Sequence, residues 1–169
     1  MQKIVAVILS VSSLCFVLVG CAAPKLDTPS GRPEVTIGGA TAQQVRNSLT
    51  GRMIGSGCQL IRETGTTITF GKTMEGVGGA LYQSLTVGAY GKRPVAEIDF
   101  TTVDVPVGVR VFAASFIQTQ NAFGATQRNS LSNNAKENRG LQNILESVKN
   151  ELDKPGQAYR PSAGNVWFP

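Results

Sequence analysis

The 169-residue chain contains no histidine. Without histidine, neither a Ser-His-Asp triad nor a Cys-His pair can form, and most zinc sites lose a ligand. The Ser-x-x-Lys pattern of another group of hydrolases is also missing from the sequence. These absences predict that the chain is not an enzyme and that it holds no metal and no other cofactor.

Clusters of like charge are missing as well. The formal net charge is +5, but the basic residues are spread along the whole chain and form no run. Scattered charge of this kind is usually solvated surface, whereas a nucleic-acid site needs a basic patch. We therefore expect no nucleic-acid partner.

The N-terminus carries the one long apolar run. Met1-Gln2-Lys3 is a short positive segment, and residues 4–19 are apolar apart from three serines. This is the layout of a secretory signal, and the run is shorter than the about 20 residues that a membrane-spanning helix needs. It ends in Leu18-Val19-Gly20-Cys21, which resembles the lipobox of bacterial lipoproteins.

The resemblance to bacterial lipoproteins implies a lipid anchor. In that family the cysteine receives a diacylglycerol, the chain is cut before it, and the new amine is acylated. This implies a signal peptide over residues 1–20 and a lipid-bearing Cys21 that holds the protein firmly on a membrane, because more than one acyl chain binds firmly. Ala22, in place of an aspartate, implies the outer membrane, with the domain in the periplasm. Residues 21–33 contain three prolines and a glycine and predict a flexible tether.

Cysteine is scarce, which limits covalent cross-links. Cys15 lies inside the signal and Cys21 is expected to carry lipid, so Cys58 is the one thiol left and no intrachain disulfide is expected. No base or lysine cluster is near Cys58 in the sequence. We therefore interpret it as a small buried hydrophobe rather than a nucleophile.

The expected domain, residues 34–152, begins with a strand and a helix. Residues 34–37 alternate polar and apolar and predict a short strand. Thr41 followed by Gln44 has the pattern of a capping box, so a helix should begin there and end at the glycines of residues 55–57. Its predicted buried side is formed by Ala42, Val45, Leu49 and Met53.

Two hairpins are expected after the helix. Residues 58–62 and 67–70 predict the first, with Ile68 and Phe70 pointing inward. Residues 76–90 fit either a short helix or a strand, and the bracketing glycines favour the helix. The second hairpin pairs residues 96–101 with residues 109–118, and its inward face contains Ala96, Ile98, Phe100, Val109, Val111, Ala113, Ser115 and Ile117.

The chain closes with a polar loop, a helix and a tail. Residues 119–133 are rich in Asn, Gln, Ser and Thr and predict a loop. Asn134 with Glu137 is a second capping signal, and the best amphipathic stretch follows it, with Leu141, Ile144, Leu145, Val148 and Leu152 on one side. Residues 153–169 have the composition of a disordered tail. The tail ends in Trp167 and Phe168, which are candidates for partner contact because aromatic anchors dominate interfaces.

These elements predict an α+β domain with an antiparallel sheet of four to five strands and two main helices on one face. The order resembles the helix-grip domains of the lipoprotein subunit of the outer-membrane barrel-assembly machine. It is also similar to small, largely uncharacterised envelope lipoproteins of Gram-negative bacteria.

Two patterns with possible chemistry have simpler interpretations. Glu97 and Asp99 share one side of a strand, with Asp104 close behind, and a calcium site or acid pair is conceivable. A solvated sheet face is the favoured interpretation. Gly71-Lys72-Thr73 resembles the end of a P-loop, but the required earlier glycine is replaced by Thr66, so a strand end is predicted.

The sequence therefore predicts a non-catalytic interaction or structural module of the cell envelope, anchored to the outer membrane through Cys21, with an envelope protein as a possible partner. The alternative is a small carrier of apolar ligands or lipids in the periplasm, with a pocket between the last helix and the sheet.

Overall fold

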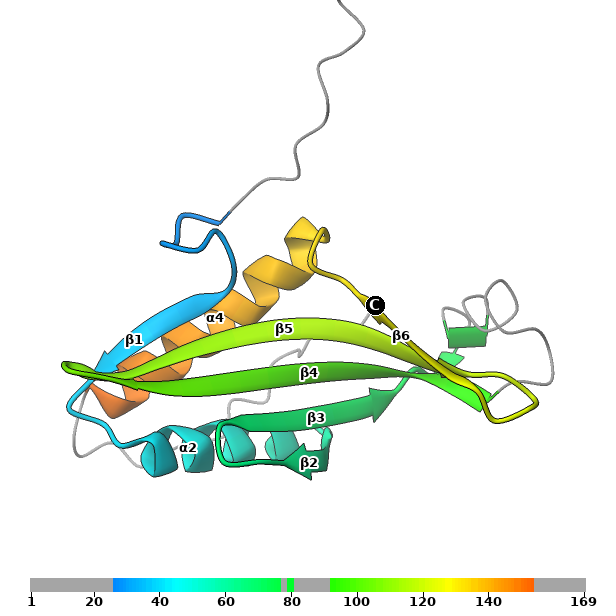
Figure 1. Ribbon diagram of the computed structural model, residues 1–169, viewed down its shortest axis with the longest axis horizontal. Coiled ribbons are helices and arrows are strands. Elements are labelled where there is room, and N and C mark those ends of the chain that lie inside the picture. The colour runs from blue at the N-terminus through cyan, green and yellow to red at the C-terminus, as the bar shows by residue number, and fades with distance from the viewer. Residues whose placement is uncertain (1–25, 77–78, 81–91, 154–169) are drawn as a thin grey trace, which may run out of the picture.

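The computed structural model describes residues 26–76, 79–80 and 92–153. This part of the chain has an α+β fold with one antiparallel sheet of six strands, where four to five strands were expected (Figure 1). In chain order, the elements are β1 (Glu34–Gly38), α2 (Ala42–Gly55), β2 (Gln59–Glu63), β3 (Thr67–Thr73), β4 (Lys92–Val105), β5 (Gly108–Gln120), β6 (Thr126–Ser130) and α4 (Ala135–Leu152).

The two long strands, β4 and β5, form the centre of the sheet. The strand order is β1-β5-β4-β3-β2, and β6 also pairs with β5. Since β4 occupies one edge of β5, β1 and β6 share the other edge. There β1 pairs with residues 108–112 and β6 pairs with residues 116–120.

Strand β6 corrects the expectation of a loop over residues 119–133. Thr119 and Gln120 still belong to β5, residues 121–125 form a turn, and β6 follows with five residues that pair antiparallel with β5. The sequence of β6, Thr-Gln-Arg-Asn-Ser, has no apolar residue and so no alternation that could signal a strand. Backbone hydrogen bonds to β5 form it, because such pairing needs no apolar side chains.

Both helices begin at the residues that the capping patterns predict. Thr41 accepts the backbone N–H of Gln44, whose side chain accepts the N–H of Thr41, which completes the capping box. Asn134 accepts the backbone N–H groups of Lys136 and Glu137. The predicted buried residues of the two helices are confirmed as Val45, Leu49, Met53, Leu141, Leu145 and Val148, with Ala42, Ile144 and Leu152 partly buried.

The main hydrophobic core contains side chains from both helices and from one set of alternate strand positions. At its centre the rings of Phe70 and Phe100 are 6.1 Å apart in an edge-to-face arrangement. The predicted inward positions of the strands are confirmed as buried: Ile68, Phe70, Ala96, Ile98, Phe100, Val109, Val111, Ala113, Ser115 and Ile117.

The chain just before β1 is folded onto the domain. Thr28 Oγ1 donates to the carbonyl of Arg32, Gly31 N–H donates to the carbonyl of Thr28, and Ser30 N–H donates to the Glu34 carboxylate at 2.8 Å. Pro33 then accepts a backbone hydrogen bond from Ala113. Residues 28–33 therefore form a hydrogen-bonded turn where the composition predicted part of a flexible tether.

Strand β2 forms an exposed edge of the sheet. All five of its residues are exposed, and its pairing with β3 is shifted by a bulge between Leu60 and Arg62. The Ile61 side chain lies over Gly71, so a larger side chain at position 71 would require Ile61 to shift. Bulges of this kind make an edge strand a poor template for pairing with another chain.

Several predicted features lie outside the described residues. These are the signal peptide, Cys21, most of residues 76–90, and the tail that carries Trp167 and Phe168. Within residues 26–76, 79–80 and 92–153, no helix is long and apolar enough to cross a membrane.

Candidate interaction surface

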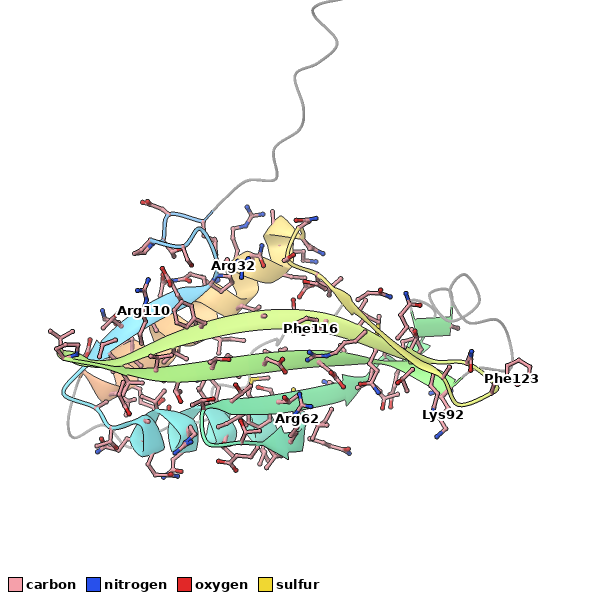
Figure 2. All side chains as sticks on the ribbon, in the orientation of Figure 1. Arg32, Arg62, Lys92, Arg110, Phe116 and Phe123 are labelled. Carbon is pink, nitrogen blue, oxygen red and sulfur yellow. The ribbon has the colours of Figure 1, made fainter. Side chains whose placement is uncertain are left out.

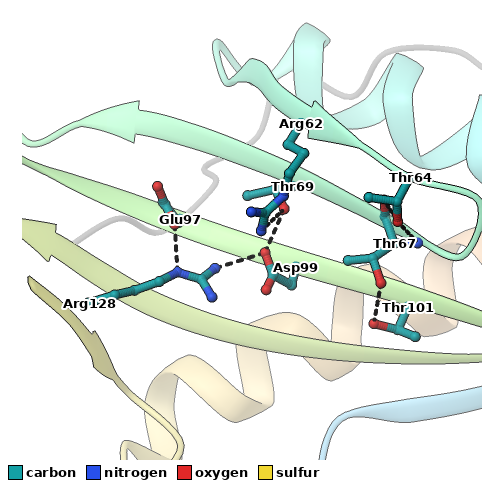
Figure 3. A network of polar contacts seen from close by, with 8 residues as sticks. All are labelled: Arg62, Thr64, Thr67, Thr69, Glu97, Asp99, Thr101 and Arg128. Carbon is teal, nitrogen blue, oxygen red and sulfur yellow. Dashed lines mark hydrogen bonds and ion pairs between the residues drawn. The ribbon is translucent and has the colours of Figure 1, made fainter. Parts of the chain in front are cut away.

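The sheet has a second face, formed by the strand positions that alternate with those of the main core, and we call it the outer face. Strand register places Thr69 beside Asp99 and Glu97 beside Phe116. Arg128 of β6 joins them through its side chain (Figure 3). The outer face therefore combines charged, hydroxyl and aromatic side chains.

Arg128 binds two carboxylates of β4 at once. Its Nε lies 2.7 Å from Glu97 Oε2, and its Nη2 lies 2.8 Å from Asp99 Oδ1 (Figure 3). The Glu97 side chain is only 6% exposed and that of Asp99 17% exposed. Arginine suits this role because its planar guanidinium presents several donors in fixed directions. The three side chains therefore hold one another in place.

An aromatic ring completes the arrangement around Arg128. The guanidinium carbon lies 3.6 Å from the centre of the Phe116 ring, which is a close cation–π contact. Burial alone would lower the pKa of Arg128, but the hydrogen bonds and charges of Asp99 and Glu97 outweigh burial and raise it. Arg128 therefore remains a cation, with its flat face on Phe116 and its edge toward the carboxylates.

Hydroxyl groups extend this network across β3. Thr69 Oγ1 donates to Asp99 Oδ1 at 2.8 Å, and Arg62 Nη2 approaches Thr69 Oγ1 at 3.5 Å, at the long limit for a hydrogen bond. One step along the strands, the hydroxyls of Thr67 and Thr101 lie 3.1 Å apart (Figure 3). Four strands thus contribute polar side chains to one connected surface.

A second group of the same composition lies further along β5. Arg110 Nη2 lies 2.8 Å from Glu34 Oε2, and its guanidinium carbon is 5.1 Å from the centre of the Phe112 ring. Burial raises the pKa of Glu34, but the hydrogen bond from Ser30 N–H and the Arg110 guanidinium lower it by more, so the net pKa is lowered. Two Arg–carboxylate–Phe groups therefore line the outer face.

The structure corrects the expectation of a solvated Glu97. Its carboxylate is buried beneath Arg128, and Asp99 binds the same guanidinium. Asp104 does not join them, because it pairs with Val109 near the other end of β4. Within the described ranges, no group of three or more acidic or cysteine side chains is arranged to hold a metal ion. In this arrangement Arg128 binds one oxygen of each carboxylate.

Cys58 is free and 4% exposed, as expected of a buried hydrophobe. Burial raises the pKa of its thiol, although the nearby charge of Lys72 acts in the opposite direction. The sequence did not reveal this lysine, because β3 brings it close only through the hairpin. A raised pKa lowers the thiolate fraction and hence the reactivity of the thiol.

Gly71-Lys72-Thr73, the stretch that resembles a P-loop end, lies within β3 as predicted. It lines an open cavity of about 320 Å³ together with Gly57, Gln59, Met74 and Glu75. A phosphate site of the P-loop kind needs backbone N–H groups at the start of a helix, whereas this cavity borders a strand. Lys72 Nζ lies 3.4 Å from the Ser56 carbonyl, to which it donates.

The residues that define the outer face could not be found from the sequence as candidates. Arg128 is in a stretch that predicts a loop, and Arg110 and Phe116 occupy the side of β5 that alternation assigns to solvent. The one signal in the sequence was the pair Glu97 and Asp99, whose negative charges on a single sheet face require a cation once they are buried.

Comparisons with protein-family models, with curated proteins and with solved structures find no match to this chain.

Proposed function

We propose that this chain is a lipoprotein anchored to the outer membrane through Cys21, and that its domain is a non-catalytic interaction module of the cell envelope. The observation that carries the proposal is the outer face, where Arg128 is fixed between two carboxylates and Phe116. Arginine and aromatic residues are the types that are enriched in protein interfaces. The partner is accordingly an envelope protein.

The side chains of the outer face are held in fixed positions, which favours binding of a partner. Side chains that are already held in place lose little conformational entropy when a partner binds. Arg128 has three contacts that restrain it, and Arg110 has two. Ala114 lies between Phe112 and Phe116 on the same strand face and is exposed, which leaves room for a partner side chain between the two rings.

The packed core favours this function over the carrier. Side chains of both helices and of the sheet have no surface accessible to water, among them Leu49, Leu145, Phe70 and Phe100. A cavity large enough for an apolar ligand would leave such side chains accessible. The 320 Å³ cavity lies beside β3 and is lined by glycine and polar residues as well as Met74, so it does not resemble an apolar ligand pocket.

The contacts of the core support a helix-grip-like arrangement, with both helices on one face of the sheet. Buried residues of α2 and α4 belong to the same cluster as Phe70, Phe100 and Val111. The side chains of the outer face are the ones that alternate with these strand positions. In this arrangement the helices leave the outer face available to a partner.

Site-specific photo-crosslinking in native membranes tests the proposed function. A photoreactive amino acid in place of Ala114 samples the outer face, and the same residue in place of Asn47 is the matched control on the exposed side of α2. We expect the Ala114 probe to capture a distinct envelope protein that the Asn47 probe does not capture. Capture of lipid alone, or equal capture from both positions, would contradict the proposal.

A further inference from the structure

The turn between β5 and β6 presents an aromatic side chain to solvent. Phe123 is 96% exposed, the most exposed of the large apolar residues in the described part of the chain. Figure 2 shows it projecting from one end of the sheet. Isolated exposed apolar residues are common on protein surfaces, so the surroundings of Phe123 decide whether it has a role.

Hydrogen bonds hold the turn in a defined shape. Asn121 Oδ1 accepts the backbone N–H groups of Phe123 and Ala125, each at 3.0 Å. The backbone of Gly124 donates to the Asn121 carbonyl, and Gln120 Nε2 donates to the Gly124 carbonyl at 2.9 Å. Gly124 has φ +84°, which favours glycine over other residues. The turn therefore holds the backbone of Phe123 while its ring points away from the domain.

Two exposed cations lie at the same end of the sheet. Lys92 pairs with Gln120, the residue before the turn, and Arg93 follows it (Figure 2). Residues 119–127 contain no acidic side chain. Glu75 follows β3 and lies at the same end. Its negative charge leaves the local net charge only weakly positive, so the Phe123 ring must supply most of any attraction to a membrane. An aromatic tip with flanking cations suits the interface of an anionic bilayer.

The turn and the membrane tether share one edge of the sheet. Strands β1 and β6 both pair with the edge of β5 that faces away from β4. The chain enters β1 through the hydrogen-bonded turn at residues 28–33. From Leu26 back to Cys21 an extended chain spans only about 17 Å, at about 3.3 Å per residue. A lipid on Cys21 would therefore keep residues 26–33, which enter this edge opposite Phe112, close to the bilayer.

We propose that the β5–β6 turn is a second membrane contact of the anchored domain. Phe123 inserts at the level of the lipid headgroups and upper acyl chains, and Lys92 and Arg93 face anionic headgroups. This inference rests on the proposed lipid anchor, which places the bilayer next to the β1/β6 edge. The contact orients the domain, so that its outer face is presented at a fixed angle to a partner.

Tryptophan fluorescence of the full mature protein in vesicles tests this contact. Trp167 is the sole tryptophan. In a Trp167→Phe background, each variant therefore contains a single tryptophan at the position under test. The Phe123→Trp variant reports on the tip, and the Val107→Trp variant is the matched control, because Val107 is 70% exposed in the β4–β5 turn at the opposite end of β5. The vesicles contain phosphatidylethanolamine and phosphatidylglycerol with brominated acyl chains, which quench nearby tryptophan.

We expect the Phe123→Trp variant to show emission at shorter wavelength and strong quenching, and the Val107→Trp variant to show neither. Replacing phosphatidylglycerol with phosphatidylcholine should weaken the quenching. Equal behaviour of the two variants, or a Phe123→Trp variant that keeps long-wavelength emission and is not quenched in the vesicles, would overturn the proposal.

The mass of the mature protein, measured on the same samples, separates this inference from the anchor. Acylated protein with a water-exposed probe at position 123 would refute the tip contact and leave the anchor intact. Unacylated protein whose probe is still quenched would refute the anchor and leave the tip contact intact.

Discussion

Glu97 and Arg128 are 31 residues apart in the sequence, yet Arg128 Nε lies 2.7 Å from Glu97 Oε2. The strands that carry them are not neighbours, because β5 lies between β4 and β6. The arginine side chain crosses β5 over the ring of Phe116 to reach the carboxylate. One ion pair thus joins three strands, and it connects the polar edge strand β6 to the centre of the sheet.

Replacing Arg128 should destabilise the domain. The Arg128→Ala variant leaves the buried Glu97 carboxylate without its partner, and an unsatisfied buried group costs about 1–3 kcal/mol. Because the Arg128 side chain is 32% exposed, water can partly replace it, so we expect the lower half of this range. Urea unfolding measures the loss.

The Glu97→Gln/Arg128→Ala double variant is the control for that loss. It removes the unpaired charge, so it should be more stable than Arg128→Ala alone. A double variant whose loss equals the sum of the two single losses would show that the pair contributes no coupling.

Acid should weaken the domain through Glu34. Its pKa is lowered in the folded protein, mainly because the Ser30 N–H and Arg110 interactions outweigh burial. A group with a lowered folded pKa stabilises the fold above its unfolded pKa, about 4.3 for glutamate, and this stabilisation is lost as the pH falls through the folded value. The Glu34→Gln variant should therefore be less stable than the native protein at pH 7. The difference should shrink below about pH 4 in thermal unfolding scans, and a difference that does not change with pH would argue against this role.

The apolar pattern of the sequence predicts much of this fold, but it does not predict the contacts of the outer face. Alternation located β1, β3, β4 and β5, and the capping residues Thr41 and Asn134 located both helices. The sequence could not predict β6, because backbone pairing alone forms it. Since Arg128 is carried by β6, the contact with Glu97 could not be predicted either, and a buried carboxylate looked like a solvated one.

Cys58 should react slowly with a charged alkylating agent such as iodoacetate. The thiol is 4% exposed and burial raises its pKa, so both access and thiolate fraction are low. Labelling followed by mass spectrometry should show little modification before unfolding and complete modification in urea. The unfolded protein is the internal control, and rapid labelling of the native protein would disprove the assignment of Cys58 as a core residue.

The tail should contribute little to stability. Residues 157–169 follow the last predicted helix and have a composition that cannot form a core. Deleting them should leave the thermal midpoint nearly unchanged while removing Trp167 and Phe168 as candidate partner contacts. A large drop in the midpoint would mean that these aromatic residues pack on the domain.

The anchor at Cys21 is the central claim, because the location, the short tether and the membrane-facing edge all depend on it. The mass of the protein extracted from native membranes tests it most directly. We predict a chain that begins at Cys21 and carries three acyl chains, and a Cys21→Ala variant that keeps its signal peptide and gains no lipid. An unacylated native protein, recovered free of the membrane, would contradict the account.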